Sequence, residues 1–183
     1  MSSHTLTQPL NIYLNDHLTG AFGGAALARR MADTHADDSR AAELRTLARQ
    51  VEEDRDALVR IMKRLAVPVH RYRTWIGLGA ERIGRLKPNG TLVHRSPLSD
   101  LVELEAMRTG VEGKAALWRA MRAVAERDPR LDMAELDRLA RRADDQARIL
   151  TGWHREVSAE VLTPDGAGSG AGSGRRADSV PGR

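Results

Sequence analysis

The stretch that decides the fold is residues 48–65, ARQVEEDRDALVRIMKRL. With two leucines just before it, its core-facing positions recur at alternating gaps of three and four, the spacing of one helix face turned inward. Every position on this face is aliphatic except Asp54. A carboxylate buried alone is too unfavourable to persist, so Asp54 needs a partner or a metal. The face contains Leu44, Leu47, Val51, Asp54, Leu58, Ile61 and Leu65.

The composition favours a helical, non-membrane protein. A chain of 183 residues can form one domain with a sizeable core, and aromatic residues make up only 3% while Ala, Leu and Arg are abundant. The chain has no cysteine, which excludes disulfides and thiolate metal sites. We see neither an apolar run that could span a membrane nor a secretory signal. We therefore expect a cytoplasmic protein.

Helical patterns and turn residues predict four long helices and one short one. The long helices come as two pairs joined by tight turns, and about 30 residues connect the pairs, enough to run the length of a bundle. This predicts an all-α four-helix bundle over residues 9–162, followed by a disordered Gly/Ser-rich tail at 163–183. The predicted helices span residues 9–34, 40–66, 72–86 (the short helix in the crossover), 97–127 and 133–162.

The pair–crossover–pair connectivity resembles that of the ferritin-like superfamily. Four local segments are similar to the family's helix motifs: LNDHL, VEEDRDALVRIMK, LVELEAM and ADDQARIL. The resemblance covers residues 9–162 and is greatest to uncharacterised bacterial ferritin-like proteins. It implies a ferritin-like four-helix bundle with a long crossover.

The same resemblance implies a degenerate di-iron site. Family members with this site use one Glu from each of two helices and a Glu-x-x-His from each of the other two. Here His17 stands where the first-helix Glu is expected, Asp54 stands for the second-helix Glu, and Glu105 fits the next one. Ala57 replaces one histidine, and the last helix, with Gln146 in the corresponding region, has no Glu-x-x-His.

Counting residues from the turns gives a second set of neighbours. His17 and Asp54 lie at a depth similar to that of Glu112 and Gln146, whereas Glu105 and His154 pair nearer one end. The family motif therefore favours Glu105 as a ligand, while depth favours Glu112. Both remain candidates.

Three interpretations of Asp54 follow. The favoured one is a structural contact with His17 across the first two helices, with no metal cofactor. The second is a bound iron or manganese ion held by His17, Asp54 and either Glu105 or Glu112. The third turns Asp54 towards a solvated seam beside Arg55.

The crossover is strongly basic. Residues 60–95 contain nine Lys or Arg and one acid, which gives about +8 in a chain of net charge +4. Such a segment could bind an anion or nucleic acid. We favour instead an arginine-rich surface that pairs with acids such as Glu103 or Glu135.

Two glycine-containing segments interrupt the helices, FGGAAL at 22–27 and TGVEGK at 109–114. Glycine weakens a helix interior, so we expect these residues where backbones pack closely, or else where a helix pauses near a site. Close packing is the favoured interpretation.

The leading function hypothesis is a non-catalytic ferritin-like protein, with a homodimer as its candidate assembly. The alternatives are a metal-dependent oxidoreductase and an anion or nucleic-acid binder acting through residues 60–95. The sequence leaves open whether the chain is an enzyme.

Overall fold

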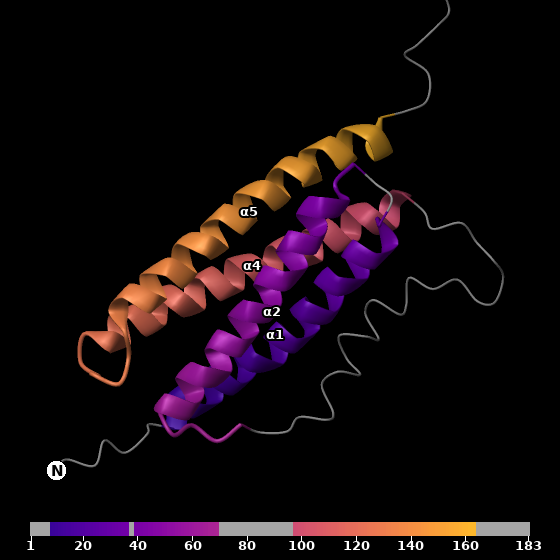
Figure 1. Ribbon diagram of the computed structural model, residues 1–183. Helices are drawn as coiled ribbons and strands as arrows, with labels where there is room; N and C mark the ends of the chain where they lie inside the picture. Colours follow the sequence, from indigo (N-terminus) through magenta and orange to yellow (C-terminus); the bar gives the residue numbers. More distant parts are fainter. Residues whose placement is uncertain (1–7, 37–38, 70–96, 164–183) are drawn as a thin grey trace, which may run out of the picture.

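The computed structural model describes residues 8–36, 39–69 and 97–163, and these form four α-helices and no strand (Figure 1). The all-α prediction is confirmed for this part of the chain. The predicted short helix at 72–86 and the tail beyond Thr163 lie outside the described residues. The helices are α1 (Gln8–Thr34), α2 (Ala41–Arg64), α4 (Pro97–Ala125) and α5 (Met133–Leu162).

The helices lie lengthwise as two hairpins. Helices α1 and α2 run side by side in opposite directions, as do α4 and α5, and α4 begins at the end of the molecule opposite to the end of α2 (Figure 1). Ion pairs join the hairpins on two sides. Arg30 of α1 lies 2.9 Å from Glu103 of α4, and Arg64 of α2 lies 2.5 Å from Glu135 of α5.

The core is built from the apolar faces of all four helices. Every residue of the predicted α2 face is buried, and this includes Asp54, which is 1% exposed. Leu14 of α1, Trp118 of α4 and Leu136 of α5 are also fully buried. Each buried side chain of this size stabilises the fold by about 1.5–3 kcal/mol relative to exposure.

Helix α2 ends through its backbone rather than at the proline that follows it. Val67 N–H donates to Met62 O (2.9 Å) and Ala66 N–H donates to Lys63 O (3.1 Å), the pair of bonds that defines a Schellman motif. Ala66 adopts the left-handed conformation that this motif requires, with φ of 56°. The chain then turns so that Pro68 O accepts a hydrogen bond from Asn15 Nδ2 of α1 at 3.1 Å.

The start of α5 depends on a side-chain cap. The Asp132 carboxylate accepts hydrogen bonds from Ala134 N (2.9 Å) and Glu135 N (3.3 Å), two of the amides that have no partner within the helix. Its negative charge also complements the helix dipole.

We therefore expect Asp132→Ala to lower the free energy of unfolding by about 1 kcal/mol, because the two amides lose their acceptor. Urea denaturation followed by circular dichroism measures this change. Asp144→Ala is the control, since that exposed carboxylate pairs with Arg119 on the surface and should contribute less than about 0.5 kcal/mol. Equal losses in the two variants would contradict the capping role.

Candidate functional site

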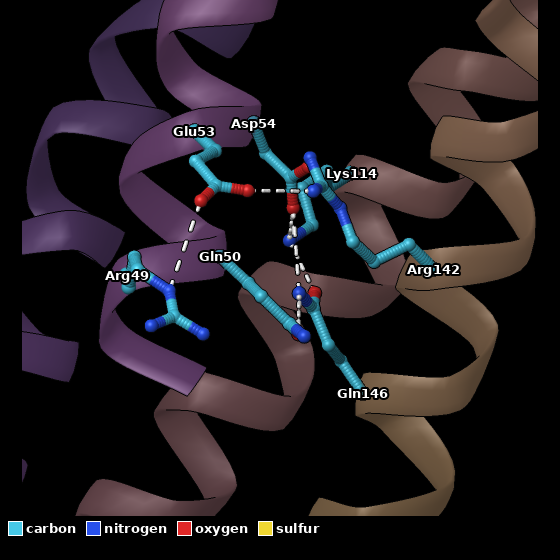
Figure 2. Close-up of polar contacts among 7 residues, drawn as sticks. All are labelled: Arg49, Gln50, Glu53, Asp54, Lys114, Arg142 and Gln146. Atoms are coloured by element: carbon cyan, nitrogen blue, oxygen red, sulfur yellow. Dashed lines mark hydrogen bonds and ion pairs between the residues drawn. The ribbon is translucent and has the colours of Figure 1, made fainter. Parts of the chain in front are cut away.

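An ion-pair network surrounds the buried carboxylate of Asp54 (Figure 2). Lys114 of α4 donates from Nζ to Asp54 Oδ2 at 2.5 Å. Arg142 of α5 donates to the other carboxylate oxygen, Oδ1. The carboxylate from one hairpin is thus held by two cations from the other.

Two amides and a second carboxylate extend the network. Gln146 Oε1 accepts from Lys114 Nζ at 2.5 Å, and Gln146 Nε2 donates to Gln50 Oε1 at 3.0 Å and to Asp54 Oδ2 at 3.5 Å. Arg142 also donates to Glu53 Oε2 at 2.9 Å. Arg49 of α2 pairs with the same Glu53 at 3.8 Å, so three cations face two carboxylates and the cluster carries a formal charge of +1 (Figure 2).

Burial makes the network interdependent. The side chains of Lys114 and Arg142 are 14% and 29% exposed, against 1% for Asp54. Removing one member of a buried pair leaves an uncompensated charge, which typically lowers stability by about 3–5 kcal/mol. Since its members come from α2, α4 and α5, the network fixes the positions of three helices relative to one another.

The predicted contact between Asp54 and His17 is wrong. The oxygens of Asp54 bind Lys114 and Arg142, while the His17 ring packs edge-on against Tyr13, with the ring centres 4.5 Å apart. Burial lowers the pKa of His17, and the nearby Asp16 partly opposes this effect. The solvated interpretation of Asp54 is also wrong, because Asp54 is buried and Arg55 pairs with Asp56 instead.

The other predicted ligands lie apart. Glu105 Oε1 lies 3.1 Å from His154 Nε2, within hydrogen-bond distance, which confirms the predicted pairing near one end of the helices. Glu112 lies at the surface, 3.7 Å from Arg108 on the same helix. Counting residues from the turns therefore gave the correct position along α4. The residue that faces inward there is Lys114, two residues after Glu112.

The described residues do not fit a di-iron centre. Asp54 already has two cationic partners, and the carboxylates of Glu105 and Glu112 bind cationic or histidine side chains elsewhere. Within residues 8–36, 39–69 and 97–163, no group of three His, Asp or Glu side chains is placed to hold a metal ion together.

Beside the network, a groove of about 1260 Å³ runs between α1 and α4 and is also lined by α2. This volume exceeds the 300–1,000 Å³ typical of small-molecule sites. Buried apolar side chains such as Leu58 and Trp118 line it, and Asp54 and Lys114 also reach it, so the ion-pair network forms part of its wall.

Five glycines line this groove, and their surroundings are open. Among the residues that the structure describes, a Cβ atom added at any of these glycines would meet no atom of a neighbouring element within 4 Å, so these residues contradict the predicted close backbone packing. Alanine in a helix interior is more stable than glycine by about 1 kcal/mol, so these glycines keep the groove wide at a cost in stability. They are Gly20, Gly23, Gly24, Gly110 and Gly113.

Sequence reasoning identified Asp54 and missed its cationic partners. The signal was present for Lys114, which follows Val111 by three residues and precedes Trp118 by four, and so occupies the apolar face of its helix as Asp54 does. It is also one of only three lysines among 29 basic residues. Arg142 gave no comparable signal, because it reaches Asp54 from a half-exposed position.

Comparison with known proteins adds no assignment to this geometry. A scan against protein-family models, a search of curated proteins and a search of solved structures each found no match.

The network predicts that alanine substitution lowers the free energy of unfolding far more at Asp54 than at the neighbouring Asp56. Asp54→Ala should lower the free energy of unfolding by about 3–5 kcal/mol, because Lys114 stays buried without its counter-charge. Asp56→Ala removes an exposed carboxylate that pairs with Arg55, and it should change stability by less than about 0.5 kcal/mol. Urea denaturation of both variants provides the comparison.

A double variant separates loss of the charge pair from loss of packing. Replacing both partners with apolar residues, in Asp54→Leu with Lys114→Met, should restore much of the stability lost in Asp54→Ala. A double variant less stable than Asp54→Ala would show that the damage comes from packing rather than from an uncompensated charge.

The network also predicts the titration of Lys114. Burial lowers its pKa below 10.5, whereas the charge and hydrogen bond of Asp54 raise it, so Asp54→Asn should lower this pKa further. In the unfolded chain Lys114 has the ordinary, higher lysine pKa. Between the pKa of the folded chain and that of the unfolded chain, the unfolded chain therefore binds more protons. The contribution of Lys114 to stability therefore rises with pH across that interval.

Carbon-13 NMR of the lysine Cε resonances measures this pKa, and the spectrum is simple because the chain has three lysines. Exposed Lys63 serves as the internal reference. Identical titration of Lys114 and Lys63 would contradict the buried ion pair.

Proposed function

We propose that this chain is a non-catalytic ferritin-like four-helix protein in which an internal ion-pair network has taken the place of a metal centre. The observation that supports this most directly is the double neutralisation of Asp54. By its resemblance to ferritin-like proteins, Asp54 stands where a di-iron protein has the metal-binding Glu of its second helix. Its two oxygens are instead held by Lys114 and Arg142.

The ammonium group of Lys114 substitutes for a metal ion in a simple electrostatic sense. Its Nζ lies 2.5 Å from both a carboxylate oxygen of Asp54 and the amide oxygen of Gln146. A covalently attached cation supplies the positive charge that buried oxygens require, and it has no redox chemistry. A role in binding or in structure follows from this arrangement.

The connectivity supports the family part of the proposal. Helix α4 starts at the end of the molecule opposite to the C-terminal end of α2 (Figure 1). This placement of the two hairpins is consistent with a pair–crossover–pair arrangement. Among the described helices, none contains an apolar stretch of the length that a bilayer requires. Nucleic-acid binding through residues 60–95 stays a prediction: Arg64 pairs with Glu135, and residues 70–95 are outside the described ranges.

Metal analysis tests the proposal. After growth with added iron and manganese, the purified protein should contain far less than one metal ion per chain, and a chelator should leave its melting temperature unchanged. One metal ion per chain, lost in Asp54→Ala, would overturn the proposal and support an oxidoreductase with Asp54 as a ligand.

The variant Lys114→Ala sharpens the test. Removing the ammonium leaves oxygens of Asp54 and Gln146 facing the vacated position, so a divalent cation such as Mn²⁺ should raise the melting temperature of this variant. The matched control is Lys114→Ala combined with Asp54→Asn, which lacks the charge and should not respond. Equal responses in the two variants would show that the ion acts elsewhere.

A further inference from the structure

The groove between α1 and α4 has the features of a ligand site that the ion-pair network alone does not explain. Stability would favour alanine at its glycines, since a Cβ atom has room at each of them. Three of these glycines, Gly20, Gly23 and Gly110, are exposed, so that the groove opens to solvent along both helices. Within the described residues, this side of the groove is therefore left open by positions that have no side chain.

The interior of the groove is apolar. Buried residues from three helices line it, and Phe22 adds an exposed aromatic ring beside the glycines of α1. An apolar body would displace water from this surface, which is the main source of affinity in such sites. Its apolar lining includes Leu27, Val51, Leu58, Val111, Leu117 and Trp118.

The charged groups of the lining point to Lys114 as the group that would bind an anion. Four of these groups are cationic and two are acidic. All four cations have acidic partners: Arg29 pairs with Glu52, Arg30 with Glu103, Arg55 with Asp56 and Lys114 with Asp54. Asp54 also pairs with a second cation, Arg142, so the charge of Lys114 is only partly compensated.

Lys114 has a donor to offer. A lysine ammonium has three N–H bonds, and the structure directs two of them to Asp54 and Gln146. The side chain retains 14% exposure at the groove wall, so the third N–H is within reach of a bound molecule. Arg142 compensates the charge of Asp54 as well, which reduces the repulsion that an incoming anion would meet.

We propose that this groove binds an amphipathic carboxylate, with the apolar body along the glycine-lined seam of α1 and α4 and the carboxylate on the Nζ of Lys114. The site requires no metal and no chemical step. It rests on the proposed function in one respect, because a metal ion on Asp54 and Gln146 would take the position of the Lys114 ammonium group that binds the carboxylate.

Binding of dodecanoate, below its micelle concentration, tests the site. Isothermal titration of the full chain should show saturable binding, accompanied by a change in tryptophan fluorescence from Trp118 in the wall. Because a charge-assisted hydrogen bond is lost, dodecan-1-ol should bind at least about tenfold more weakly, and dodecyltrimethylammonium should bind more weakly still. Equal binding of the alcohol would overturn the assignment of a carboxylate.

Groove-filling variants locate the site without disturbing the core. Gly110→Leu and Gly23→Leu place a side chain in open space, so both should fold, and each should weaken dodecanoate binding by about tenfold or more. Gly152→Leu is the matched control: its Cβ also meets nothing within 4 Å, but it lies on α5 away from the groove, and its affinity should be unchanged.

Three results would overturn the proposal. These are no saturable binding to the wild-type chain, undiminished binding to Gly110→Leu, and a concentration-dependent dimer of the wild-type chain that Gly110→Leu abolishes. The last result would assign the groove to a second copy of the chain. Lys114→Met provides a separate check where it folds, since it should abolish the preference for dodecanoate over dodecan-1-ol.

Discussion

The burial of one negative charge constrains the rest of this structure. Asp54 projects from an otherwise aliphatic helix face into a core that provides little solvation, and it persists there because two cations reach it from the opposite hairpin. The same two cations also donate hydrogen bonds to Gln146 and Glu53. The network thereby converts an unfavourable residue into a set of contacts among α2, α4 and α5. The network contributes more to the specificity of the fold than to its net stability, since replacing a whole buried ion pair with apolar residues typically costs little stability.

The glycines of the groove show a second compromise between stability and another property. Helix interiors favour alanine, and the space for a methyl group is present at each of these positions. A sequence selected for stability alone would fill the seam between α1 and α4. The glycines and the partly used donors of Lys114 meet at the same wall, which is why the groove and the ion-pair network form one candidate site.

The sequence predicted the parts of the structure that depend on periodicity. The spacing of Leu44 to Leu65 identified a buried helix face and the exceptional position of Asp54 on it, and counting from the turns placed Glu105 beside His154. It failed where the outcome depends on side-chain reach. His17 and Lys114 were both available to Asp54, and a lysine stem extends across the core further than an imidazole does. The groove also escaped prediction, because a glycine pattern does not distinguish tight packing from open space.

The contact between Lys114 and Asp54 also has a consequence for how the two hairpins meet. Helices α2 and α4 belong to different hairpins, so this charge pair must be matched each time one hairpin docks on the other. Sliding one hairpin by a single helical turn, about 5.4 Å, would preserve much of the contact between aliphatic faces but would separate the two charges inside the core. Aliphatic packing alone tolerates such slippage. The buried pair therefore fixes the register of the two hairpins, because only one alignment brings the two charges together and the neighbouring alignments leave them apart in the core.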